Sequence, residues 1–267
     1  MKKIFIAGAT GQLGSYLKIQ LKKKYRLFTK KIDLSKKSAI KNLKNINPDI
    51  IINCAGLTDI EKCERFKKFA LKLNKNIPEN LAKFVLTFDK YLIHFSTDHV
   101  YDSKINKKNS EKDLNIRNFY AKSKYLGEIA AKNKNTLILR TNFFGNSPKK
   151  KGLIHWIFES EKKGKKISLY KNIFFSPLHI STLSKIIIKI IPRKIYGTYN
   201  LGSRNGMSKA KFIEELIKFK KLNIRYKIMN YKNKLLRRPK NMIMNINKFE
   251  KKFKLKLPEL KNEINKL

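Results

Sequence analysis

Residues 8–14, Gly8-Ala9-Thr10-Gly11-Gln12-Leu13-Gly14, carry the strongest indication of the fold in this sequence. They follow a short apolar run, residues 3–7, and lead directly into a segment with apolar residues at helical spacing. A glycine turn at a helix N-terminus lets backbone N–H groups approach a pyrophosphate, and the helix dipole favours the anion. The spacing G-x-x-G-x-x-G departs from the simplest dinucleotide fingerprint, and a turn without a ligand is the alternative. Its place after the first strand of a βαβ unit favours the nucleotide.

The same alternation of short strands and longer helices continues along the chain. Strands are expected at residues 3–7, 25–28, 50–54, 92–96 and 136–139, and helices at residues 12–23, 38–45, 78–88, 119–131, 153–163, 180–191 and 208–219. This pattern predicts an α/β fold, a doubly wound Rossmann-type parallel sheet with a smaller C-terminal lobe. We expect residues 1–145 to form an NAD(P)-binding domain on which residues 172–200 pack back, and residues 146–267 to be mainly a substrate-binding lobe.

Composition narrows the class of protein. Of the 267 residues, 42% are hydrophobic, enough for a sizeable core, and lysine or asparagine interrupts every apolar run before it reaches membrane-spanning length. The formal net charge of +44 raises nucleic-acid binding as a hypothesis. The lysines are scattered and no nucleic-acid motif accompanies them, so a composition bias is favoured. Cys54 and Cys63 fit neither a disulfide framework nor a metal-ligand pattern, so the sequence predicts a cytoplasmic protein without a metal site.

An acidic residue and a run of small residues follow the second and third predicted strands. Asp33 stands where a carboxylate could reach an adenine or ribose edge, although a helix N-cap is an equal alternative. Lys30 and Lys31 stand where a 2'-phosphate would lie, which keeps NADP open. The third strand finishes in residues 53–56, Asn-Cys-Ala-Gly, which let a cofactor pass closely, unless the small residues only serve a tight turn.

The fourth strand and the helix after it carry the residues suited to proton transfer. The strand ends in Ser96-Thr97-Asp98, and such folds place their chemistry at the carboxyl ends of parallel strands. Tyr120 and Lys124, four residues apart on a helix, share one face. A cation beside a phenol lowers the tyrosine pKa and suits it to proton exchange near neutral pH. In so lysine-rich a chain, this spacing taken alone favours a solvated helix face.

In their order and spacing, the motifs resemble those of the extended short-chain dehydrogenase/reductase superfamily, and within it the dTDP-4-dehydrorhamnose reductase family. The segments that carry the resemblance are GATGQLG (8–14), PDIIINCAGLTDIEKCE (48–64), FSTDHVY (95–101), NFYAKSKYLGE (118–128), LRTNFFG (139–145) and RRPKN (237–241). The resemblance implies an NAD(P)H-dependent reduction of the 4-keto group of a nucleotide-linked deoxysugar, in surface polysaccharide or deoxysugar biosynthesis.

The resemblance also implies roles for individual residues. Tyr120 would protonate the developing alkoxide, Lys124 would hold the ribose hydroxyls and lower the tyrosine pKa, and Thr97 would hydrogen-bond the carbonyl oxygen. Residues expected at the cofactor are Gly8, Gly11, Gln12, Leu13 and Gly14 at the pyrophosphate, Asp33 and Leu34 near the adenine, Ala55, Gly56 and Thr58 along the cofactor, and Tyr120 and Lys124 themselves. Residues expected at the substrate are Ser96, Thr97, Asp98, Asn142 and Arg238, the last at a pyrophosphate oxygen or in a structural salt bridge.

The expected cofactor is NADP or NAD, with NADPH slightly favoured, and the expected partner is a nucleotide sugar. A homodimer stays open, and nucleic acid is not expected. The segment Phe175-Ser176-Pro177-Leu178 departs from the G-x-P-T common in the family, which leaves the sugar and its nucleotide open. One alternative is a nucleotide-sugar 4-epimerase or another sugar-nucleotide-modifying enzyme. A non-catalytic NADP-binding regulatory subunit is the other, and the intact set of Thr97, Tyr120 and Lys124 counts against it.

Overall fold

A computed structural model describes residues 1–148, 150–232 and 236–267 of the chain. It divides into two compact units. Unit 1 comprises Met1–Thr97, Asn118–Arg140 and Ser184–Tyr199, and unit 2 comprises Asp98–Arg117, Thr141–Leu183 and Asn200–Leu267. The two units interleave along the chain. The chain leaves unit 1 after Thr97, Arg140 and Tyr199, and it returns to unit 1 at Asn118 and Ser184.

Unit 1 is built on a six-stranded sheet with the strand order β10-β5-β4-β3-β1-β2. The strands are β1 (Lys3–Ala7), β2 (Arg26–Phe28), β3 (Ile50–Asn53), β4 (Tyr91–Thr97), β5 (Thr136–Thr141) and β10 (Gly197–Leu201). Strand β1 pairs in parallel with β2 and β3, and β3 pairs in parallel with β4. The predicted α/β fold with a parallel central sheet is therefore confirmed. Strand β10 was not expected, because its sequence GTYNL is short and half polar.

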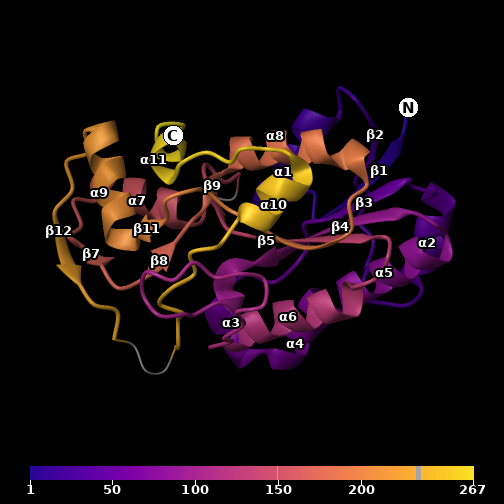
Figure 1. The fold of residues 1–267 in the computed structure, drawn as a ribbon, viewed down its shortest axis with the longest axis horizontal. Helices are drawn as coiled ribbons and strands as arrows, with labels where there is room; N and C mark the ends of the chain where they lie inside the picture. The colour runs from indigo at the N-terminus through magenta and orange to yellow at the C-terminus, as the bar shows by residue number, and fades with distance from the viewer. Residues whose placement is uncertain (149, 233–235) are drawn as a thin grey trace. The chain divides into compact units, whose positions relative to one another are not determined.

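Helices cover both faces of this sheet. They are α1 (Gln12–Leu21), α2 (Ala39–Ile46), α3 (Ile60–Arg65), α4 (Lys67–Leu71), the π-helical turn η1 (Lys72–Asn76), α5 (Ile77–Thr87), α6 (Phe119–Ala131), α8 (Ile180–Ile190) and the 3-10 turn η3 (Ile191–Arg193). Figure 1 shows α1 and α8 on one face of the sheet and α5 and α6 on the other. The helices expected from periodicity begin and end within two residues of those observed, but α3, α4 and η1 were not expected because they are short.

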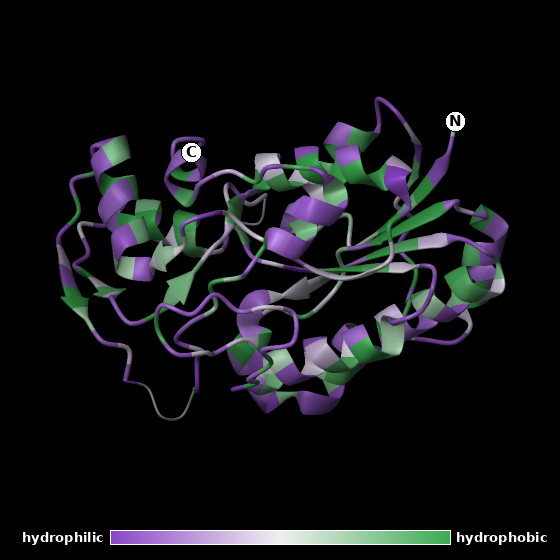
Figure 2. Ribbon diagram, in the orientation of Figure 1, coloured by the Kyte–Doolittle hydropathy of each residue, from purple (hydrophilic) through white to green (hydrophobic). Residues whose placement is uncertain are grey.

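The core of unit 1 lies on both faces of the sheet, with alternate strand residues pointing to each face. Phe5, Ile51, Leu92 and Ile138 come from four different strands and pack in one cluster with α2, α5 and α6. The strand residues beside them in sequence are buried as well, so both faces of the sheet are covered. Figure 2 shows hydrophobic stretches, in green, on the strands of this sheet.

Unit 2 contains short strands and helices around a separate core. Its elements are η2 (Asp98–Val100), β6 (Phe143–Phe144), α7 (Leu153–Lys162), β7 (Ile167–Tyr170), β8 (Phe174–Phe175), β9 (Leu178–His179), β11 (Met207–Ser208), α9 (Lys209–Lys220), β12 (Tyr226–Met229), α10 (Asn247–Phe253) and α11 (Leu260–Ile264). The strands form three pairs, β12 with β7, β11 with β8 and β6 with β9. The ring of Phe212 lies edge-on to Phe144 and Phe175, with centroids 4.9 and 5.3 Å away.

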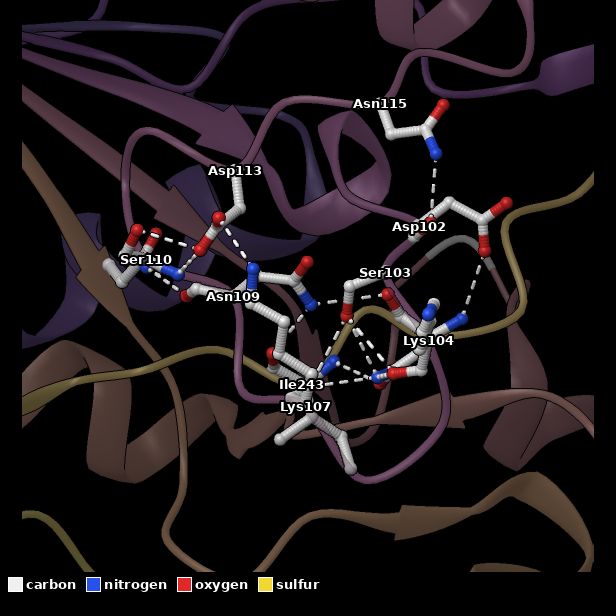
Figure 3. Close-up of polar contacts among 11 residues, drawn as sticks. Asp102, Ser103, Lys104, Lys107, Asn109, Ser110, Asp113, Asn115 and Ile243 are labelled. Atoms are coloured by element: carbon white, nitrogen blue, oxygen red, sulfur yellow. Dashed lines mark hydrogen bonds and ion pairs between the residues drawn. The ribbon is translucent and has the colours of Figure 1, made fainter.

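Buried amides fix the loop of residues 102–117 within unit 2 (Figure 3). Asn109 Nδ2 donates to the carbonyl oxygens of Asn241 and Ile243, at 3.2 and 2.8 Å. Asn241 Nδ2 donates in turn to the carbonyl oxygens of Lys104 and Lys107, at 2.7 and 2.8 Å. Asn241, the last residue of the RRPKN segment, therefore anchors this loop through its side chain.

No helix within the three described ranges combines the length and the apolar composition that crossing a membrane requires.

Candidate active site

The glycine turn after β1 holds two glycines for steric reasons. Gly8 has φ +75°, and a Cβ there would lie 2.7 Å from the backbone nitrogen of Ala55. A Cβ on Gly14 would lie 2.2 Å from the carbonyl oxygen of Gly8, so α1 packs directly on the turn. Gly11 differs, since its φ is −78° and a Cβ there would meet only the Gly8 oxygen, at 3.2 Å. Packing explains Gly8 and Gly14, whereas Gly11 leaves its side of the turn open.

The first turn of α1 fits the pyrophosphate of a dinucleotide. Gly11 is its N-cap and provides no side-chain acceptor, and the first turn contains no acidic residue. A helix N-terminus of this kind favours an anion, because its first N–H groups point outward along the helix axis and the dipole is positive there. Gln12 is half-buried, and Leu13 and Gly14 are buried.

Asp33 and Leu34 follow β2 with opposite environments. The Asp33 carboxylate is exposed, accepts hydrogen bonds from the Ser35 hydroxyl and N–H, and lies 3.9 Å from Lys72 Nζ. The Ser35 hydroxyl bond is the main cause that lowers the pKa of Asp33. Leu34 is buried in the core of unit 1, and its carbonyl oxygen accepts from Asn80 Nδ2 at 2.9 Å. Asp33 thus offers an ionised acceptor, while the Leu34 side chain faces the core.

The segment after β3 is shaped by asparagine side chains. Asn53 Oδ1 accepts from the Ala55 N–H at 3.0 Å, and Asn53 Nδ2 lies 3.0 Å from His94 Nδ1 on the neighbouring strand. Gly56 and Thr58, which follow, are exposed. The three positions expected along the cofactor, Ala55, Gly56 and Thr58, therefore lie on one loop whose start is fixed to the sheet.

Asn74, in the π-helical turn η1, joins this loop to α6. Its Oδ1 accepts from the Leu57 N–H at 2.8 Å, and its Nδ2 donates to the Leu57 carbonyl and to Ser123 Oγ, both at 2.9 Å. π-helical turns are rare and often occur at functional sites. Asn74 was not expected at the site, because the residue type alone carries little signal in a chain so rich in asparagine.

Helix α6 directs the face that carries Tyr120 and Lys124 to the interior of unit 1. Its N-cap Asn118 accepts from the Ala121 N–H at 2.9 Å, and the Phe119 N–H donates to Glu64 on α3 at 2.7 Å. Tyr120 and Lys124, one turn apart, are only 8% and 5% exposed. The prediction of a solvated helix face, which the spacing taken alone favours, is therefore wrong for Tyr120 and Lys124.

The Lys124 ammonium lies between β4 and the loop of residues 54–59 after β3, here named the cofactor loop for the role expected of Ala55, Gly56 and Thr58. Its Nζ donates to the carbonyl oxygen of Phe95 on β4 at 2.6 Å, and a Cβ added at Gly56 would lie 3.8 Å from it. Burial lowers the pKa of Lys124 to about 8, and the carboxylate of Glu128 partly opposes that shift. Thr97, two residues beyond Phe95, is 3% exposed at the end of the same strand.

Ser96 lies between Phe95 and Thr97 and is also buried. Its hydroxyl donates a short hydrogen bond to Glu128 Oε1 on α6. Ser96 was expected at the substrate, but its hydroxyl hydrogen is donated to Glu128 within unit 1.

The other residues expected at the substrate belong to unit 2. Asn142 Nδ2 donates to Asp98 Oδ2 at 2.8 Å, and Asp98 is 1% exposed. The Arg238 guanidinium lies over the Tyr231 ring, 5.8 Å from its centroid. Arg238 and Asp98 also act on the charge of Lys209, which was not expected. Burial and Arg238 lower the pKa of Lys209 to about 8, and Asp98 opposes them.

The Lys209 ammonium lies 5.7 Å from the centroid of the Phe175 ring. Two neighbouring cations near one carboxylate suit an anionic ligand. No sequence signal distinguishes Lys209, because lysine is common throughout the chain.

Within the described ranges, no group of three or more His, Cys, Asp or Glu side chains could hold a metal ion.

Comparison with known proteins extends over the whole chain. Residues 1–267 match the family model described as RmlD substrate binding domain. A probable low-salt glycan biosynthesis reductase of Haloferax volcanii is 27% identical over 176 residues, which are 63% of this chain and 58% of that protein's length. A dTDP-4-dehydrorhamnose reductase of Shigella flexneri is 26% identical over 281 aligned residues, covering 96% of this chain and 93% of that protein.

Solved structures share the fold. The dTDP-4-dehydrorhamnose reductase of Clostridium acetobutylicum superposes with a TM-score of 0.92 at 25% identity and covers 99% of this chain and 97% of its own. The Bacillus anthracis dTDP-4-dehydrorhamnose reductase, in complex with NADP, superposes with a TM-score of 0.93 at 24% identity, over 100% of this chain and 98% of its own.

Proposed function

Because the chain belongs to the RmlD substrate-binding domain family, we propose that it is an NAD(P)H-dependent reductase of the 4-keto group of a nucleotide-linked deoxysugar, as its dTDP-4-dehydrorhamnose reductase relatives are named. The observation that carries this proposal is the position of Lys124. Its ammonium is one turn from Tyr120, bound to the end of β4, and beside Gly56 of the loop that fits a dinucleotide.

In this reaction, the bound dinucleotide supplies the hydride that the ketone carbon receives. The Tyr120 hydroxyl gives its proton to the oxygen of that carbonyl, so the ketone becomes an alcohol. The Lys124 ammonium stabilises the negative charge left on the tyrosine oxygen and donates to the ribose hydroxyls. The Thr97 hydroxyl hydrogen-bonds the carbonyl oxygen while charge develops on it.

The chain's other polar residues bind the two ligands. The N–H groups at the start of α1 hold the cofactor pyrophosphate, with Gly8, Gly11 and Gly14 allowing its approach. Gln12 and Leu13 belong to the same turn, and the Asp33 carboxylate accepts hydrogen bonds near the adenine. On the substrate side, Asp98 and Asn142 bind the sugar, and Arg238 and Lys209 bind the diphosphate as a pair of cations.

The test is oxidation of NADPH or NADH, followed by absorbance, when the purified protein meets a dTDP-4-keto-6-deoxyhexose. Consumption that is lost in Tyr120→Phe is the expected result, because phenylalanine keeps the ring but has no proton to give. If cofactor binds but no keto sugar is reduced, the reductase proposal fails. Retention of bound NAD through purification together with interconversion of 4-epimers would then favour an epimerase.

Three further expectations belong to this proposal. NADPH is the favoured cofactor, a cytoplasmic location is consistent with the two free thiols, and binding of nucleic acid is not expected. A homodimer remains open.

A further inference from the structure

Glu128 lies on the same face of α6, one turn beyond Lys124 and two turns beyond Tyr120. It is 4% exposed, and its side chain forms an ion pair with Arg140 of β5, which is equally buried. Arg140 Nε lies 3.0 and 3.1 Å from the two carboxylate oxygens, and the Nη2 to Oε2 distance is 2.6 Å. Arg140 thus binds both carboxylate oxygens of Glu128.

Stability alone is a weak reason to bury these two charges. A buried ion pair loses its hydration, and replacement by well-packed apolar residues is often neutral or stabilising. A carboxylate held in this way has a defined position opposite the Arg140 guanidinium. It can orient the groups that it touches.

The carboxylate touches the strand that carries Thr97. Ser96 Oγ donates to Glu128 Oε1, and Lys124 Nζ donates to the carbonyl oxygen of Phe95 at 2.6 Å. Two successive residues of β4 are therefore bound by two side chains one turn apart on α6. This pair of contacts limits both the slide and the rotation of the strand end relative to the helix.

We propose that Glu128, held by Arg140, is a positioning residue for the reaction. It fixes Ser96 and with it the end of β4, and its negative charge balances the Lys124 ammonium. This inference rests on the proposed reductase function.

The charge on Lys124 depends on few groups. Glu128 is the foremost charged group that raises the pKa of Lys124 against the effect of burial. Cys54 and Cys63 also face the ammonium, but burial raises the pKa of both thiols, that of Cys63 to about 11, so they are neutral at pH 7. Burial and the Lys124 charge lower the pKa of His94, which is then neutral too.

The first measurement reports the charge of Lys124 without any substrate. The folded protein is labelled with trace acetic anhydride between about pH 6 and about pH 11, and mass spectrometry quantifies acetylation of the Lys124 peptide. The wild-type midpoint is expected near the pKa of about 8 given by burial. Loss of the carboxylate in Glu128→Gln is expected to lower it by roughly one unit or more. Glu128→Asp, which keeps the charge, should restore most of the shift.

Two further variants separate the loss of the Glu128 charge from a general loss of folding. Glu250→Gln is the control, because Glu250 on α10 also forms a two-bond ion pair with an arginine, Arg204, at 2.8 and 3.0 Å, in a more exposed position. It should leave the Lys124 midpoint unchanged. If Glu128→Gln does not fold because Arg140 is left unpaired, Glu128→Gln with Arg140→Gln removes both charges, and the lowered midpoint is expected there.

The second measurement is kinetic and concerns Ser96. Ser96→Ala keeps Glu128 charged, so the Lys124 midpoint should stay at its wild-type value while kcat falls about tenfold and KM for the cofactor changes little. A midpoint unchanged by Glu128→Gln, or full kcat in Ser96→Ala, overturns the inference. If no keto sugar is reduced by the wild type but the midpoint shifts as expected, only the proposed function fails.

Discussion

At the scale of single residues, Lys124 is a cation that the fold makes titratable close to neutral pH. A solvated lysine stays charged to beyond pH 10. Burial against Phe95 and the cofactor loop lowers the Lys124 pKa to about 8, with the Glu128 carboxylate opposing the shift. Below that pH the ammonium form dominates, and above it the neutral amine does.

The rate of keto-sugar reduction should therefore fall as pH rises through about 8, because neutral Lys124 no longer stabilises the tyrosine oxygen. The check is kcat measured between about pH 6 and about pH 10, with unfolding followed in parallel to exclude loss of structure. Lys124→Met should have low activity without this alkaline limb. A wild-type rate that is flat up to pH 10 would contradict the assignment.

The two glycines Gly11 and Gly14 should separate cofactor binding from folding. In Gly14→Ala the Cβ would lie 2.2 Å from the Gly8 carbonyl oxygen, so the helix must move, and we expect a loss of about 1–3 kcal/mol in unfolding free energy. Gly11→Ala meets only that oxygen, at 3.2 Å, and should stay within about 1 kcal/mol of wild type.

The same Gly11 substitution adds a methyl group where the pyrophosphate approaches, and affinity for NADPH should fall at least about tenfold. Calorimetric titration with NADPH and denaturant unfolding of both variants provide the comparison. Gly11→Ala with unchanged affinity would indicate that this turn does not face the cofactor.

At the scale of elements, the π-helical turn η1 holds the loop after β3 in a fixed position relative to α6. The turn directs Asn74 inward, where three hydrogen bonds reach Leu57 and Ser123. Gly127 of α6 lies against the same turn, since a Cβ there would be 2.0 Å from the Asn74 carbonyl oxygen. The cofactor loop and α6 are therefore connected through η1.

Asn74→Ala should lower the free energy of unfolding by about 1–3 kcal/mol, because the Leu57 and Ser123 groups lose their partner. It should also weaken NADPH binding, because the loop at Gly56 is no longer fixed. Lys75→Ala is the control within the same turn, since it removes only an exposed ion pair with Glu79 at 3.6 Å. Equal effects of the two substitutions would show that Asn74 has no special role.

At the scale of the whole molecule, the net charge of +44 acts on every anionic ligand. A positive field increases the rate at which anions arrive, and salt screens it over about 10 Å at 0.1 M. Both proposed ligands carry a diphosphate, whereas the chemical step takes place among buried groups such as Tyr120 and Lys124.

We therefore expect kcat/KM for NADPH and for the sugar nucleotide to fall several-fold from about 20 mM to about 300 mM NaCl, with kcat nearly constant. Initial rates at several salt concentrations give both parameters. A steep, salt-dependent affinity for DNA of random sequence, exceeding that for the sugar nucleotide, would instead revive nucleic-acid binding.

Local pattern was sufficient for much of this protein. The apolar run of β1, the glycine turn and the helical spacing that follows are properties of neighbouring residues, so they predicted a Rossmann-type sheet and a dinucleotide site before any contact was known. The expected helix at residues 119–131 has the bounds of α6, because Asn118 caps its start within the sequence itself.

Long-range contacts decided the rest, because no short-range pattern encodes which distant side chains meet. Burial of Tyr120 and Lys124 distinguishes this pair from the similar spacings that arise by chance in a lysine-rich chain. The interleaving of units 1 and 2, the anchoring roles of Asn74 and Asn241, and the ion pair of Glu128 with Arg140 each join segments far apart in sequence. Lysine and asparagine are so frequent in this chain that only their tertiary contacts distinguish a buried, hydrogen-bonded residue from a solvated one.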